Sequence, residues 1–170
     1  GIVVERALRV AGDEFDEAIV DYMKRKHKLI IGDLTAEEMK MSIGSACEMK
    51  QEMQFVARGR NMTKGLPESV KVGSEEIRGA LSGVVRQIIS STKDVLEETQ
   101  AELVSDVIKN GVVVAGGGAL LYGIDRAISE ATKMPVWIAE DPLTCVVRGC
   151  GKVLSDGELL KQVKVVGGLR

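Results

Sequence analysis

A run of three glycines directly after a short valine strand constrains this chain more than any other feature. Val112 to Ala115 are apolar and rich in β-branched valine, which is typical of a buried strand. Gly116, Gly117 and Gly118 then allow a sharp turn free of side chains, and apolar residues recur at helical spacing from Ala119 to Thr132. Free backbone N–H groups and the positive end of a helix dipole meet at such a turn, which predicts an anion site. A tight turn with no ligand remains the alternative, since a glycine triplet alone favours neither.

The composition is that of a soluble globular protein and argues against several functions. The 170 residues suffice for one domain with a proper core, and the net charge is −2. Aromatic residues make up 3% of the chain, too few for base stacking, and the basic run from Lys24 to Lys28 is read as the solvated end of a helix. We therefore predict no nucleic-acid partner. The three cysteines lack metal-ligand spacing and are predicted to be buried thiols: Cys47, Cys145 and Cys150.

Hydrophobic periodicity predicts alternating strands and helices along the chain. We expect a strand at 1–10, a helix at 13–29, a helix capped by Thr35 and Glu38, a hairpin with strands at 53–60 and 69–72, helices beginning at Ser74 and Thr99, the valine strand, the helix from Ala119, a strand at 136–138 and a helix at 141–154. Small residues in the last helix, with Cys145, Val146 and Cys150, predict that it packs against the sheet.

This order of elements predicts an α/β fold in two parts. Residues 1–32 and 93–170 would form the main α/β subdomain. Residues 33–92 would form a smaller inserted subdomain, built as a helix, a hairpin and a helix.

Six short motifs occur in the order in which one protein family carries them. They are GDEFD at 12–16, TAEEMK at 35–40, GLP at 65–67, ELVSD at 102–106, AGGGALL at 115–121 and DPLT at 141–144. Together they resemble the second half of the bacterial actins of the MreB family, which are rod-shape-determining filament proteins. The resemblance extends to about Leu154 and implies the second lobe of an actin-like ATPase (ribonuclease H-like) fold.

The resemblance also implies a nucleotide held in a cleft between two lobes. It assigns the base and ribose to Glu37 and Lys40, which lie one helical turn apart, so that a carboxylate can accept the ribose hydroxyls beside an ammonium group. Without the family, an exposed ion pair worth about a few tenths of a kcal/mol would be the better reading of these two residues. The glycine turn, assigned as Gly116, Gly117, Gly118 and Ala119, would lie beside the α-phosphate and the base.

Other parts of the family's site belong to its first lobe and would precede Gly1. They are further phosphate loops, the aspartates that hold Mg²⁺ and the residue that positions the attacking water. The implied cofactor is therefore ATP, with Mg²⁺ held mainly by the other lobe, and half a cleft is not expected to hydrolyse it. Asp13, Glu14 and Asp16 are read as first-turn helix acids, so that no catalytic residue and no metal ligand is assigned to this chain.

The fold implied by the resemblance leaves the sheet incomplete. The strand at 1–10 would join the central strand through two further strands that should precede residue 1, and folded proteins avoid such unpaired edges. We therefore expect a fragment of a longer protein, or a piece completed by a partner or by swapping.

The function implied by the resemblance is that of the ATP-binding lobe of a filament protein. Such a protein assembles head to tail in the cytoplasm, at the inner face of the membrane, and directs rod shape together with membrane-bound cell-wall elongation proteins. A lobe of a heat-shock chaperone-type ATPase, which shares the motif at 12–16 and the basic stretch at 24–27, is the alternative. A sugar-kinase lobe is a third reading. The choice between ATP and GTP stays open.

Overall fold

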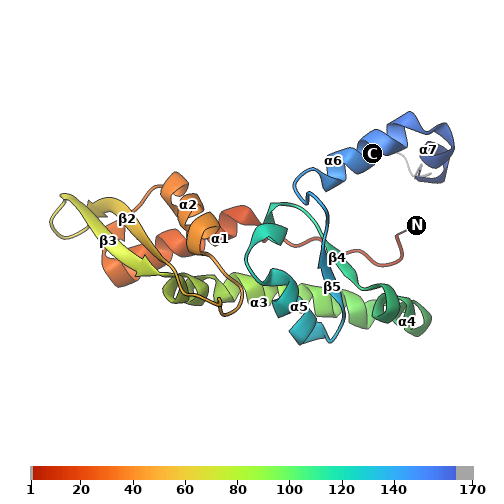
Figure 1. Ribbon diagram of the computed structural model, residues 1–170, viewed down its shortest axis with the longest axis horizontal. Coiled ribbons are helices and arrows are strands. Elements are labelled where there is room, and N and C mark those ends of the chain that lie inside the picture. The colour runs from red at the N-terminus through yellow and green to blue at the C-terminus, as the bar shows by residue number, and fades with distance from the viewer. Residues whose placement is uncertain (1, 164–170) are drawn as a thin grey trace.

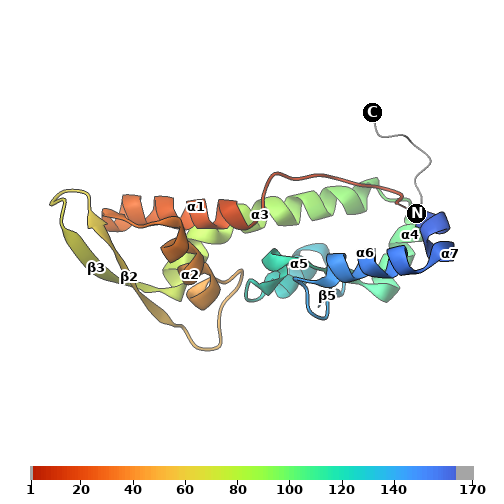
Figure 2. The same ribbon diagram turned by 90° about the horizontal axis from the view of Figure 1, so that it is seen from above.

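One long helix, α3 (Ser74–Glu98), runs along the middle of the elongated molecule in a computed structural model that describes residues 2–163 (Figures 1 and 2). Its buried face is formed by Ile77, Leu81, Val84 and Val85, the helical period expected from the sequence. At its start the Gly73 amide donates to the side chain of Glu76, which completes a cap.

Helices and an antiparallel sheet gather at one end of α3. They are α1 (Gly12–Tyr22) with its π-helical extension (Met23–His27), β1 (Leu29–Ile30), α2 (Asp33–Ile43), β2 (Gln54–Asn61) and β3 (Pro67–Gly73). The strand order is β1-β2-β3, and the β2–β3 hairpin pairs Phe55 with Val72. The main core lies where α1, α2 and the sheet pack on α3, around buried Ile19 and Met39. The hairpin and α3 therefore lie close to the residues that the sequence predicts for them, and a helix also precedes the hairpin.

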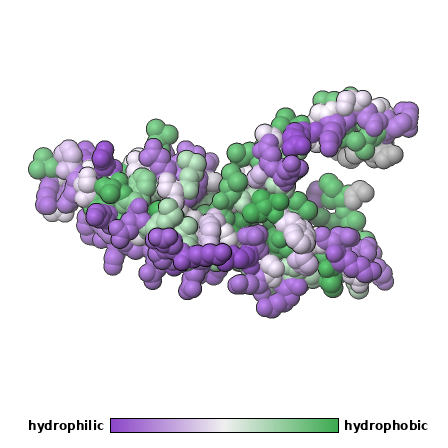
Figure 3. Space-filling model, in the orientation of Figure 1, coloured by the Kyte–Doolittle hydropathy of each residue, from purple (hydrophilic) through white to green (hydrophobic). Residues whose placement is uncertain are grey.

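A smaller parallel sheet lies beside the other end of α3 (Figure 1). Its elements are α4 (Ala101–Asn110), β4 (Val112–Val114), a 3₁₀ turn (Gly117–Leu120), α5 (Ile124–Thr132) and β5 (Val136–Ile138), followed by α6 (Cys145–Ser155) and α7 (Gly157–Val163). The facing residues Val113 and Trp137 are both exposed. Figure 3 shows apolar residues gathered on the surface around the turn and these strands.

The strand expected at 1–10 does not form in the described part of the chain. Residues 2–10 are irregular, and Arg6 instead pairs with Asp94 and Glu98 near the end of α3. A strand needs a neighbour to accept and donate its backbone hydrogen bonds, and β4 among the described residues pairs only with β5.

Several helix starts also differ from the expected ones. α4 begins at Ala101 and not at Thr99, and α6 begins at Cys145 and not at Asp141. α2 begins at Asp33 because extended Gly32 lets its carbonyl accept from the Ala36 amide at 3.1 Å, so that Thr35 lies inside the helix. The helix expected from Ala119 begins only at Ile124. Gly123, with φ +72°, separates it from the 3₁₀ turn.

The last long helix does not pack against the sheet. α6 projects from the body in Figure 1, and none of its residues is buried. The prediction of buried thiols is accordingly wrong for Cys150, which is exposed, while Cys47 and Cys145 are half-buried. No helix within residues 2–163 combines the length and apolar character that a membrane span requires.

The two-part division at residues 33 and 92 stays a prediction. α3 continues across the second boundary, and α1 contacts both α2 and α3.

Candidate functional site

The glycine turn, which we define as Gly116–Leu120, has the side-chain-free geometry expected from the sequence. Gly116 has φ +86°, a conformation that favours glycine, and its amide donates to the Pro142 carbonyl at 2.7 Å. The Ala119 amide donates back to the Gly116 carbonyl at 3.1 Å. As the first residues of the 3₁₀ turn, Gly117 and Gly118 have amides without an acceptor inside that turn.

The space around the turn is open on its glycine side. A Cβ atom at Gly116 or Gly118 would meet no heavy atom within 4 Å. A Cβ at Gly117 would meet only the Leu143 side chain, at an ordinary contact distance of 3.5 Å. Ala119, by contrast, is 1% exposed and anchors the turn in the fold. The turn therefore leaves room for a ligand to approach the backbone, which is what an anion site requires.

Lys40 has partners that its place in the sequence does not reveal. Its ammonium lies 2.7 Å from Asp16 Oδ2 and donates to the Gly12 carbonyl at 3.2 Å. Glu37 is exposed one turn earlier on α2, and no ion pair between Glu37 and Lys40 occurs within residues 2–163. Packing of α1 on α2 brings Asp16 opposite Lys40. Lys40 therefore forms a half-buried ion pair with Asp16 of the neighbouring helix and not an exposed pair with Glu37 of its own helix.

The two sets of predicted residues come from neighbouring parts of the fold. The segment after α2 adjoins the segment after the glycine turn, because the Ala46 amide donates to the Tyr122 carbonyl at 2.8 Å and Ser45 bridges to Tyr122. Both ribbon views place the start of α1, α2 and the 3₁₀ turn next to one another (Figures 1 and 2). Whether Glu37, Lys40 and the glycines contact one ligand stays a prediction.

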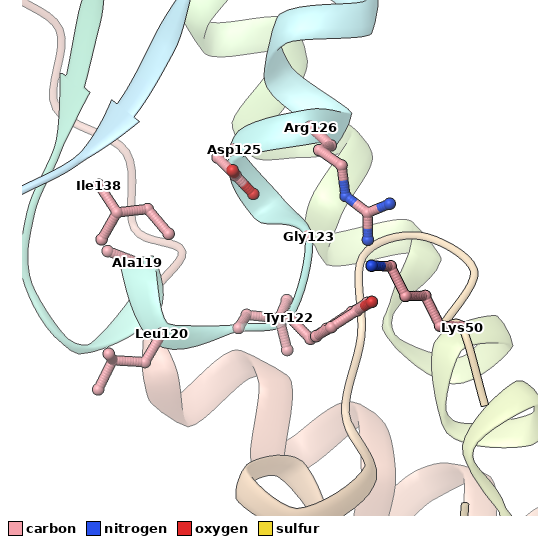
Figure 4. Close-up of a pocket in the computed structure, with 9 residues that line it drawn as sticks. Lys50, Ala119, Leu120, Tyr122, Gly123, Asp125, Arg126 and Ile138 are labelled. Atoms are coloured by element: carbon pink, nitrogen blue, oxygen red, sulfur yellow. The ribbon is translucent and has the colours of Figure 1, made fainter. Parts of the chain in front are cut away.

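An open pocket of about 510 Å³ lies on the Tyr122 side of the turn (Figure 4). Of the residues predicted for the site, only Ala119 lines it. Figure 4 shows the Lys50 amine directed toward Arg126 and the Tyr122 hydroxyl. The Arg126 guanidinium also lies over the Tyr122 ring, 5.1 Å from its centroid. These residues carry no motif, and sequence reasoning did not find them.

A half-buried thiol lies under this pocket. A Cβ on Gly123 would overlap the sulfur of Cys47, so the two residues are in close contact. Burial raises the pKa of the Cys47 thiol, and the nearby Arg126 charge only partly opposes this effect. The raised pKa favours the neutral thiol over the nucleophilic thiolate.

Two of the acids at the start of α1 have protein partners. The Glu14 carboxylate accepts from the Ala11 amide at 2.6 Å and so caps the start of α1, while Asp16 binds Lys40. No group of three or more His, Cys, Asp or Glu within residues 2–163 is arranged to hold a metal ion.

Comparisons with known proteins give one consistent answer. A family model described as MreB/Mbl protein matches residues 1–162. The cell shape-determining protein Mbl of Bacillus subtilis is 40% identical over 96% of this chain and 49% of its own length. The cell shape-determining protein MreB of Escherichia coli K12 is 44% identical over 91% of this chain and 44% of its own length. The chain thus spans about half the length of these relatives.

Solved structures agree with the sequence relatives. Crystal structures of MreB 5 of Spiroplasma citri, one bound to AMPPNP and one to ADP, share 36% identity with TM-scores of 0.89 and 0.90. They align over 95% and 98% of this chain and over 48% and 50% of their own chains. A MamK double helical filament aligns with a TM-score of 0.74 over 88% of this chain and 46% of its own. At 23% identity, the MamK likeness shows the fold alone. The predicted actin-like α/β fold is confirmed.

Proposed function

The chain belongs to the MreB/Mbl family, and from this premise we propose that it is the ATP-binding second lobe of an actin-like filament protein that determines cell shape. Family membership sets aside the chaperone-type and sugar-kinase readings. The relatives that carry the family name are described as cell shape-determining proteins.

Nucleotide binding is assigned to two surfaces of this chain. The amides of Gly117 and Gly118, with open space beside them, suit a phosphate group, because backbone N–H groups and the dipole of a turn stabilise negative charge. Lys40 and Glu37 on α2 are assigned to the ribose and base. The side-chain-free turn with its open flank carries the proposal. The relatives from Spiroplasma citri, at 36% identity, bind AMPPNP and ADP in their crystal structures, which supports it.

Mg²⁺ and the hydrolytic step are assigned to residues outside this chain. The described residues hold no cluster suited to a metal ion, and phosphoryl transfer depends on positioning and charge neutralisation from both sides of the phosphates. When bound, Mg²⁺ would neutralise charge on the phosphate oxygens. This lobe would supply binding and orientation.

The whole protein would assemble from identical subunits stacked head to tail, which is a contact that does not close and so yields an open polymer. We place these filaments in the cytoplasm at the inner face of the membrane, with membrane-bound cell-wall elongation proteins as partners. The filament described for MamK, which shares the fold, is consistent with such assembly.

Sedimentation of the full-length protein tests this proposal. We expect the protein to pellet in high-speed centrifugation with ATP and Mg²⁺ and to stay in the supernatant without nucleotide. GTP in a parallel sample determines the nucleotide preference. A full-length, folded protein that binds neither nucleotide in equilibrium dialysis would contradict the proposed function.

A further inference from the structure

We propose that Asp16 is a positioning residue that holds the Lys40 ammonium in place for the nucleotide. The inference rests on the proposed function and adds to it a residue for which the sequence indicates only a helix-terminal charge. Asp16 lies on α1 and Lys40 on α2, and 24 residues separate them in the chain.

The contact between the two side chains is well enclosed. Their side chains are 17% and 18% exposed, and the N–O distance is 2.7 Å. The helices are fixed on either side of the pair, because Phe15 and Ile19 of α1 and Met39 of α2 are buried in the same core. The bridge therefore joins two rigid elements and is not a pairing of mobile surface chains.

The hydrogen-bond inventory of Lys40 leaves one donor for a ligand. An ammonium group has three N–H donors. One faces Asp16 Oδ2 and a second donates to the Gly12 carbonyl. The third is available to a neutral acceptor on the nucleotide, such as a ribose hydroxyl oxygen or a ring nitrogen. Because a free lysine side chain carries much rotamer freedom, anchoring it beforehand lowers the entropy lost on binding.

Asp16 itself bears a feature that packing alone does not explain. Its Oδ1 is buried and has no hydrogen-bond partner within the described residues. An unpaired buried acceptor is destabilising, and an apolar residue at this position would avoid it. A carboxylate at this position is consistent with a role for its negative charge, which holds the Lys40 ammonium through Oδ2.

The test uses the full-length protein and measures the Kd for ATP together with the thermal midpoint. We compare Asp16→Asn, Lys40→Met and the double variant with the wild type. Asp13→Asn is the matched control, because it removes the same charge from an exposed position of the same helix. We expect each single variant to weaken ATP binding about tenfold and the double variant to bind no more weakly than Lys40→Met. Asp13→Asn should bind like the wild type.

If Asp16 acts by positioning Lys40, Asp16→Asn should weaken ATP binding only while Lys40 is present. A purely structural role would instead lower the thermal midpoint to the same extent whether or not Lys40 is present. Multiplicative losses in the double variant, or wild-type affinity in Asp16→Asn, would overturn the inference while nucleotide binding stands. Wild-type affinity in Lys40→Met would also overturn it.

If Asp16→Asn does not fold, Asp16→Glu serves in its place, because it moves the carboxylate by one methylene and should still weaken ATP binding. Unchanged affinity of Asp16→Glu would overturn the inference. Absence of ATP binding by the wild type would instead contradict the proposed function.

Discussion

At the scale of single residues, Gly123 is a glycine for two independent reasons. Its φ of +72° favours glycine, and a Cβ there would overlap the Cys47 sulfur. We predict that Gly123→Ala lowers the free energy of unfolding by about 1–3 kcal/mol in urea titrations. Gly149→Ala in α6 is the control, because its Cβ would meet open space, and it should leave stability unchanged or raise it slightly. Equal stabilities of Gly123→Ala and wild type would show that Cys47 and the backbone adjust freely.

The sequence predicts some residues of the site and cannot predict others. Gly116 to Gly118 are recognisable as a sharp turn, because three adjacent glycines after a strand let the chain bend without side chains, while their role as an anion site stays a prediction. The partner of Lys40 is not recognisable, because Asp16 lies 24 residues away and meets it only once α1 packs on α2. Spacing along one helix instead suggests the pair with Glu37, which does not form in the described part.

At the scale of elements, a half-buried network joins the end of α1 to the start of α3. Glu76 Oε2 accepts from the Tyr22 hydroxyl at 2.7 Å and lies 3.0 Å from His27 Nε2 in the π-helical turn. Burial alone would raise the pKa of Glu76, but the bonds from Tyr22 and the Gly73 amide outweigh it and hold that pKa below its ordinary value. Burial and the neighbouring Glu76 raise the pKa of Tyr22 to about 12.

A pH dependence of stability follows from the direction of the Glu76 shift. Since the folded-state pKa is the lower one, the stabilisation is complete above the unfolded-state pKa of about 4.3 and is lost as the pH falls through the folded-state value. We predict that the wild type loses unfolding free energy more steeply than Glu76→Gln between pH 5 and about 3. Glu75→Gln, an exposed neighbour, is the control. Parallel pH profiles for wild type and Glu76→Gln would contradict this account.

Elements whose partners lie within the chain are those that the sequence predicts correctly. The β2–β3 hairpin and α3 follow their periodicity because each buries its apolar face against its neighbours. The strand expected at 1–10 fails because β propensity alone does not supply a pairing neighbour. The packing expected of α6 also fails, because Val146 and Val147 are exposed and no residue of this helix is buried.

At the scale of the whole molecule, the two ends of α3 differ in how completely they are packed. The end with the three-stranded sheet has a continuous core, whereas the two-stranded sheet leaves Val113, Trp137 and Ile138 exposed. A two-stranded sheet with an uncovered apolar face is marginally stable and prone to association. The chain also spans about half the length of its relatives.

We predict that the 170-residue chain alone does not behave as a compact monomer. In size-exclusion chromatography it should elute as associated species, and Val113→Lys with Trp137→Lys should shift it toward the monomer by removing the apolar face. A monomeric wild-type chain with one sharp melting transition would contradict this prediction.

Binding of ATP to full-length Gly117→Val is the most direct test of the central claim that the glycine turn receives the nucleotide phosphates. The fold should tolerate this change, because a Cβ at Gly117 makes only an ordinary contact with Leu143 and the residue has no positive φ. Gly83→Val, at an open position of α3, is the control and should bind ATP like the wild type. We predict that Gly117→Val keeps its thermal midpoint and loses measurable ATP binding in isothermal titration. A folded Gly117→Val protein that binds ATP with wild-type affinity would contradict the account.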